Sequence, residues 1–207
     1  MSTAAVATTG RWTPVWASVL GGVALGALDF LWIKVVPFPL GGLGNSSAVW
    51  AVVAFVFAYR LRRGPLVSVL GSVVLLVLAV PSYYLTAVLV QADDPGAVWS
   101  PVWTAFAVVA GVVFGAAGSL AHGRRQVPAL AVPVAVLFAE AGLLAARVGD
   151  PNHDAAELLG QAAIEVGLGV LVTLVVRATR RRRAAALLLA APLAVLGFVL
   201  FRVAGFA

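Results

Sequence analysis

Residues 14–36 read PVWASVLGGVALGALDFLWIKVV, an apolar run in which one carboxylate, Asp29, lies away from both ends. A run of about twenty apolar residues is long enough to cross a bilayer as a helix. A charged side chain inside such a helix costs about 2.5–3.5 kcal/mol on insertion scales, so its presence points to a function. The run therefore predicts a membrane-spanning helix and makes Asp29 a candidate functional residue.

Two further apolar runs carry a carboxylate in the same way, Glu140 within residues 127–147 and Glu165 within residues 155–177. An α-helix rises about 1.5 Å per residue, which places Asp29 and Glu140 about 10 Å, and Glu165 about 15 Å, from one side of the membrane. We expect the three acids to share an intramembrane pocket.

The whole chain has the composition of a membrane protein. It is 62% hydrophobic and 11% charged, whereas soluble domains are about 45–50% apolar and about 25% charged. We predict a single all-α transmembrane bundle over residues 1–207, with a disordered tail over residues 1–13. The predicted helices are 14–36, 46–60, 65–91, 99–121, 127–147, 155–177 and 184–205. The second is short, so we expect it to begin in the preceding glycine-rich stretch or to lie partly inside the protein.

Charge in the loops predicts the orientation. Arginines follow the second, fourth and sixth apolar runs, and the acids of the loops lie in the intervening connections. The positive-inside rule then places the N-terminus in the cytoplasm and the C-terminus outside. The Ala/Val/Arg-rich composition suggests a multi-pass protein of the bacterial cytoplasmic membrane. The net charge of +6 does not indicate nucleic-acid binding, because the arginines cluster in these short loops between apolar runs.

Polar and aromatic side chains gather in the same half of the predicted bundle as the acids. Glu157, Gln161 and Glu165 recur at helical spacing and form a polar stripe that descends from the outer surface. Arg147 either pairs with Glu140 or extends to the membrane interface. We predict as substrate-contacting residues Trp32, Trp50, Tyr83, Tyr84, Trp103, Phe106, Gln161 and Arg147. Tryptophan and tyrosine also concentrate at membrane interfaces for structural reasons.

Two GxxxG patterns, Gly22/Gly26 and Gly111/Gly115, permit close helix contacts. They serve either packing within the bundle or docking of a partner, which includes a second copy of the chain.

Buried acids beside aromatic rings suit proton chemistry. Burial and like charge favour the protonated form of at least one acid, and a protonated carboxyl can donate while a second carboxylate accepts. Aromatic faces attract cations. The chain has no cysteine, and we expect neither a metal site nor a cofactor. Asp93 and Asp94 lie in a turn, so a magnesium-dependent diphosphate-ionising site is not expected.

In its size, its seven-helix layout and its intramembrane acids among aromatic residues, the chain resembles the small bacterial integral-membrane terpene cyclases. The resemblance implies an enzyme that protonates an alkene or epoxide of a lipophilic isoprenoid, with Asp29, Glu140 and Glu165 as catalytic acids. Its partners would be that substrate and membrane lipids. The alternatives are a substrate-capture subunit of a vitamin transporter, which usually has six helices, and a structural membrane protein whose acids serve helix association.

Overall fold

The computed structural model describes residues 9–205, and for residues 9–13 and 97 the backbone alone. Between these limits the protein is entirely helical, which confirms the predicted fold class. The α-helices are α1 (Thr9–Val35), α2 (Ser47–Leu61), α3 (Pro65–Gln91), α4 (Pro101–Leu120), α5 (Gln126–Ala146), α6 (Ala155–Val175) and α7 (Arg180–Val203). Two short 3-10 helices, η1 (Gly41–Asn45) and η2 (Pro95–Trp99), precede α2 and α4.

Six of these helices are long and apolar enough to cross a membrane, and α2, with 15 residues, is the shorter apolar helix between them. The protein is therefore a multi-pass membrane protein. Backbone polar groups have no water partner in hydrocarbon, so a helix that begins below the surface must be enclosed by protein.

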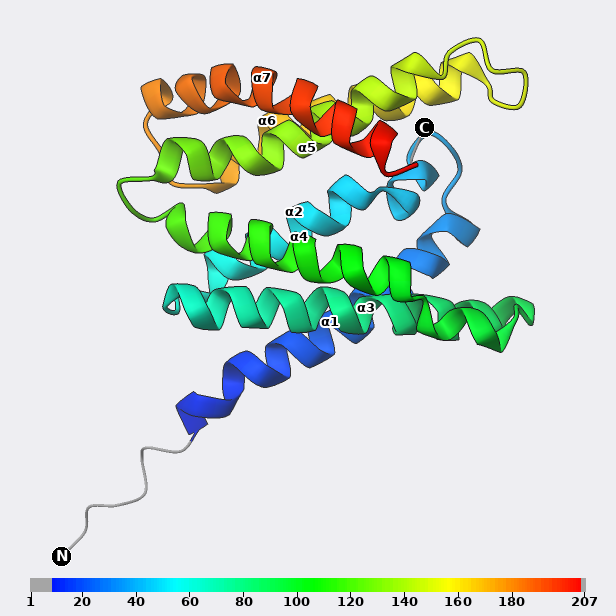
Figure 1. Ribbon diagram of the computed structural model, residues 1–207, viewed down its shortest axis with the longest axis horizontal. Coiled ribbons are helices and arrows are strands. Elements are labelled where there is room, and N and C mark those ends of the chain that lie inside the picture. Colours follow the sequence, from blue (N-terminus) through cyan, green and yellow to red (C-terminus); the bar gives the residue numbers. More distant parts are fainter. Residues whose placement is uncertain (1–8, 206–207) are drawn as a thin grey trace, which may run out of the picture.

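The bundle has two groups of three helices with α2 between them (Figure 1). Helix α3 packs between α1 and α4 in one group, and α5 packs against both α6 and α7 in the other, while α2 contacts α3, α4 and α5. The side chains of Ala48, Ala54, Phe55 and Ala58 are completely buried along α2. The short helix is therefore enclosed by the bundle, as its length predicted.

Glycines allow α3 to approach its neighbours closely. A Cβ atom at Gly26 of α1 would lie 2.1 Å from the carbonyl oxygen of Ala79 in α3, and one at Gly111 of α4 would lie 2.6 Å from the Cα of Val73. Gly22 and Gly115 face α3 in the same way. Both GxxxG patterns thus serve internal packing, and formation of an oligomer stays a prediction.

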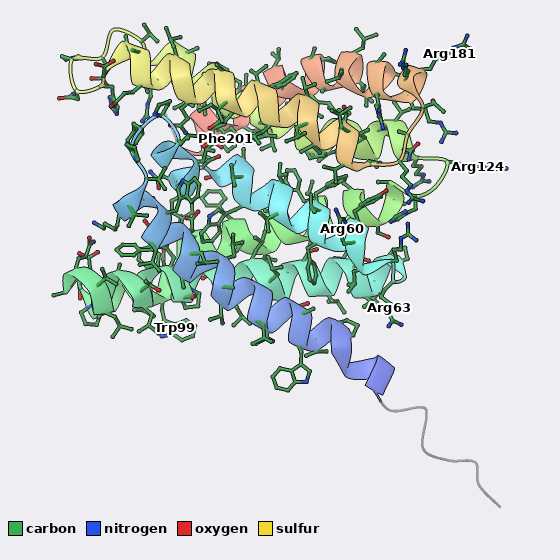
Figure 2. All side chains as sticks on the ribbon, turned by 180° about the vertical axis from the view of Figure 1, so that it is seen from behind. Arg60, Arg63, Trp99, Arg124, Arg181 and Phe201 are labelled. Carbon is green, nitrogen blue, oxygen red and sulfur yellow. The ribbon has the colours of Figure 1, made fainter. Side chains whose placement is uncertain are left out.

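Most arginines lie at one end of the bundle, whereas Arg147 follows α5 and Arg202 lies in the last turn of α7 at the other end. Figure 2 shows Arg63, Arg124 and Arg181 at this end, and Trp99 and Phe201 toward the opposite end. Helix α1 begins on the arginine side and α7 ends on the other. The positive-inside rule assigns the arginine end to the cytoplasm.

Helices α4 and α7 begin at residues other than those predicted, and a side chain caps each of them at its observed start. Ser100 accepts a hydrogen bond from the Trp103 N–H, so α4 begins at Pro101, after η2, and not at 99. Thr179 accepts one from the Arg182 N–H, so α7 begins at 180 and not at 184. The predicted tail is wrong for residues 9–13, which belong to α1; residues 1–8 lie outside the described part of the chain.

Candidate functional site

Residues 37–46 connect α1 to α2 and are called here the entry segment; Phe38 and Leu40 in its first half are exposed, whereas most of its second half is buried. Gly41, Gly42 and Gly44 are buried in it. The indole Nε1 of Trp32 donates a hydrogen bond to the carbonyl oxygen of Leu40 at 2.9 Å. Because a Cβ at Gly44 would lie 2.7 Å from the Ile33 side chain, only glycine lets the segment pack this closely on α1.

Glu140 of α5 binds the N-terminus of α2. Its Oε2 accepts hydrogen bonds from the Ala48 N–H at 2.6 Å and the Ser46 hydroxyl at 3.1 Å, and the Ser47 N–H also donates to this carboxylate. The first N–H groups of a helix lack partners within the helix and carry partial positive charge, which favours an anion there. Ser46 caps the same helix by accepting a hydrogen bond from the Val49 N–H.

No salt bridge joins Glu140 to Arg147 in the described part of the chain. Arg147 follows the last turn of α5, and its side chain is exposed. Of the two interpretations given for Arg147, pairing with Glu140 is therefore wrong. The carboxylate instead accepts its hydrogen bonds at the start of α2.

Glu165 of α6 is fully buried, with an exposed fraction of 0%. The Nε2 of Gln161 donates to Glu165 Oε1 at 3.0 Å and to the carbonyl oxygen of Gly42 at 3.2 Å. The second carboxyl oxygen, Oε2, has no hydrogen-bond partner among the described residues. Glu140 lies close enough to interact electrostatically with Glu165. A buried carboxyl with one unused oxygen beside a second carboxyl can hold a proton or receive a ligand.

The predicted polar stripe on α6 descends from water to the interior. Glu157 is exposed, Gln161 is 6% exposed and Glu165 is 0% exposed. The entry segment lies over the middle of the stripe through Gly42. The stripe therefore leads to the two glutamates and is covered by the entry segment.

Asp29 lies among aromatic rings contributed by α1, α2 and α3. The indole N–H of Trp50 donates a hydrogen bond to the Asp29 carboxylate. Tyr83 is close enough to interact electrostatically with Asp29. Tyr83 has edge-to-face contacts with three other rings, with centroids 5.4 Å away for Phe30, 6.3 Å for Trp50 and 5.4 Å for Tyr84. These four residues are called here the aromatic cluster.

The three intramembrane acids thus form two separate sites near the start of α2. Asp29 contacts the aromatic cluster, whereas Glu140 and Glu165 interact with each other and with the entry segment. The structure places three predicted contact residues, Trp50, Tyr83 and Tyr84, with Asp29 and brings Gln161 to Glu165.

Other predicted contacts have different surroundings. Trp32 anchors the entry segment and is 42% exposed. Trp103 and Phe106 contact each other on α4, with ring centroids 5.9 Å apart, and are 39% and 37% exposed. These two predicted contact residues of α4 therefore face outward from the bundle.

The two cavities described on the bundle lie away from the acids. One of about 690 Å³ lies at the arginine end, and one of about 450 Å³ lies beside Trp99 and Pro101. Neither is lined by Asp29, Glu140 or Glu165.

The loop between α5 and α6 contains hydrogen bonds between its own residues and to the start of α6. Asp150 accepts a hydrogen bond from the Asn152 backbone N–H, which lowers the pKa of this carboxyl, and lies 3.1 Å from His153 Nδ1. Asp154 caps α6 by accepting hydrogen bonds from the N–H groups of Ala156 and Glu157.

Sequence reasoning missed two parts of this site. Phe30 was not proposed as a contact residue, although it directly follows Asp29 and its ring is 3% exposed. The N–H of Ala48 and the carbonyl of Gly42 are backbone groups, so no side chain in the sequence indicates their role. The glycines and polar residues at positions 41–47 are the unusual feature of this stretch.

One family model matches residues 5–205 and is described as a family of unknown function (DUF6518). The chain belongs to this family. No curated protein and no solved structure matches the chain. Membership in this family assigns no activity. The geometry around Asp29, and around the Glu140–Glu165 pair, is therefore the basis for a functional proposal.

Proposed function

We propose that the protein is a membrane enzyme that cyclises a lipophilic isoprenoid by proton transfer, in the manner of the small integral-membrane terpene cyclases. The observation that carries the proposal is the position of Asp29, whose carboxyl group contacts Trp50 and lies beside Tyr83 within the aromatic cluster. An acid next to several aromatic faces is the arrangement that a proton-initiated carbocation reaction needs.

In this proposal, protonated Asp29 donates its proton to a terminal alkene or epoxide. The ring bond forms as another alkene of the same substrate attacks the resulting cation, while Trp50 and Tyr83 stabilise the positive charge. The Asp29 carboxylate then removes a proton from a neighbouring carbon, so the reaction is an isomerisation and the acid is regenerated. Substrate would enter sideways from the lipid of the cytoplasmic membrane of a bacterium.

The test compares membranes that contain the full chain or its Asp29→Asn variant, supplied with farnesol, geranylgeraniol and their terminal epoxides. Cyclic products are measured by gas chromatography and mass spectrometry. We expect Asp29→Asn to lower the product yield by at least about 100-fold, the low end of general-acid contributions. Asp93→Asn, which changes an exposed acid in the α3–α4 turn, is the matched control and should keep the wild-type yield.

Two results would contradict the cyclase proposal. One is equal cyclisation by wild type and Asp29→Asn. The other is folded wild-type protein that converts none of these substrates.

A second candidate function, capture of a small polar ligand from the outer side for transport, is favoured by the unpartnered Oε2 of Glu165 at the end of the polar stripe. Native mass spectrometry of protein purified from membranes tests it. A water-soluble adduct that is present on wild type and on Glu157→Gln but lost from Glu165→Gln would support capture. Wild-type protein that carries no adduct would count against it.

A further inference from the structure

The cytoplasmic end of the bundle carries a cavity of about 690 Å³ that the proposed function does not use. It lies where α2 and α4 end and where α3 and α5 begin. Its lining residues are Arg62, Arg63, Pro65, Ser119, Leu120, His122, Gly123, Arg124 and Arg125. The cavity is shallow and largely open, and Arg62, Arg63, Arg124 and Arg125 in its lining are exposed, so a ligand would bind at the surface of the bundle.

The lining of this cavity is strongly cationic, with arginines from two different connections. All eight acidic residues of the sequence lie elsewhere: Asp29, Asp93, Asp94, Glu140, Asp150, Asp154, Glu157 and Glu165. None of these carboxylates belongs to the lining of the cavity. Guanidinium groups bind phosphate oxygens with paired hydrogen bonds, so the chemistry of the cavity suits a phosphate group.

His122 is held in a fixed orientation at this cavity. Its ring stacks on Tyr59 with centroids 4.3 Å apart and planes 6° from parallel. Its Nε2 lies 2.8 Å from the carbonyl oxygen of Tyr59, and it must carry the hydrogen because a carbonyl only accepts. This lining residue is thus ordered by contacts with α2 before any ligand binds.

Apolar side chains lie at the margin of the cavity. Leu120 and Pro65 belong to its lining, and Leu66, the next residue of α3, is 70% exposed. Cationic groups therefore meet the lipid-facing surface of the spanning helices at this point. We infer that the cavity binds the phosphate headgroup of an anionic phospholipid in the cytoplasmic leaflet, with its acyl chains along α3 and α4.

The test uses the full chain in micelles that contain equal amounts of phosphatidylglycerol and phosphatidylcholine, with retained lipids counted by native mass spectrometry. Wild type should retain phosphatidylglycerol preferentially. Arg124→Gln/Arg125→Gln should reduce its retention at least about tenfold, because each cation near an anionic headgroup adds to the binding. Arg180→Gln/Arg181→Gln removes the same charge from exposed residues at the same end, outside the lining, and should leave retention unchanged.

A third variant and a competitor separate the remaining sources of binding. Arg124→Lys keeps the charge but loses the paired hydrogen bonds, and it should lower retention partly. Inorganic phosphate, added at constant ionic strength with chloride, should not displace the lipid. Equal losses in both double variants, no lipid preference in wild type, or displacement by inorganic phosphate alone would each overturn the assignment of a phospholipid.

Discussion

At the scale of single residues, the three intramembrane acids have different surroundings. Glu140 satisfies N–H groups at the start of α2, Glu165 keeps one oxygen without a partner in the described chain, and Asp29 lies among aromatic rings. The hydrogen bonds at the start of α2 are a sufficient structural reason for a carboxylate at position 140. The surroundings of Asp29 and Glu165 give no comparable structural reason for a carboxylate at those positions.

Replacement of Glu140 should test this structural role. Glu140→Ala leaves the Ala48 N–H without its acceptor, and we expect the free energy of unfolding to fall by about 1–3 kcal/mol. Glu140→Gln should cost less, because an amide oxygen still accepts the hydrogen bond. Denaturant unfolding in detergent measures both, with Asp93→Ala of the exposed turn as the control. Equal stability of Glu140→Ala and wild type would contradict the role.

How far the sequence predicts the site depends on whether a contact involves a side chain. The polar stripe from Glu157 to Glu165, with its buried end, followed from spacing and residue type. The contact between Glu140 and Ala48 did not, because it joins a side chain to a backbone group 92 positions away. Such pairs depend on how helices pack, which periodicity does not specify.

At the scale of helices and connections, the apolar runs predicted all seven α-helices, whereas their packing depends on small residues. Helix α3 lies between α1 and α4 at glycines of both neighbours, and the entry segment fits against α1 and α6 at glycines of its own. Close backbone approach is how membrane helices gain van der Waals contact. A side chain added at these points must separate two elements.

Gly26→Ala should therefore be strongly destabilising. The added Cβ would lie 2.1 Å from a backbone oxygen of α3, so α1 and α3 must move apart, and we expect a loss of about 2 kcal/mol or more. Gly167→Ala on α6 is the matched control, since a Cβ there meets nothing within 4 Å. Thermal unfolding in detergent compares them. Similar melting temperatures for the two variants would show that α1 and α3 are not packed closely.

The entry segment should loosen when its anchor is removed. Trp32→Phe keeps an aromatic ring but loses the hydrogen bond to Leu40, which is worth about 0.5–1.5 kcal/mol. We expect faster hydrogen–deuterium exchange across residues 37–46, measured by mass spectrometry. Trp16→Phe, at an exposed position of the same helix, should leave this exchange unchanged. Unaltered exchange in Trp32→Phe would mean that the glycine contacts alone hold the segment.

At the scale of the whole molecule, charge divides the bundle into two ends of different character. Arg63, Arg124 and Arg181 lie at one end, and the acids of the loops, Asp93, Asp94, Asp150 and Asp154, lie in the connections at the opposite end. The proposed lipid site and the proposed catalytic site consequently lie in opposite halves. A change in one half should leave the chemistry of the other intact.

The orientation can be tested with single cysteines, because the natural chain has none. Asn152→Cys lies in the α5–α6 loop and should react with a membrane-impermeant maleimide in intact cells. Gly123→Cys lies in the α4–α5 connection, and it should react only after the membrane is permeabilised. The reverse labelling pattern would invert the orientation of the bundle.

The hydrogen bond between Glu140 and the start of α2 has a consequence for biosynthesis. The acceptor for the Ala48 N–H is made 92 residues later, long after α2 has left the ribosome. In a nascent chain that ends after α4, Ser46 can already cap the Val49 N–H, but the Ala48 N–H has no carboxylate acceptor. The start of α2 therefore gains its full set of hydrogen bonds only after α5 has been made.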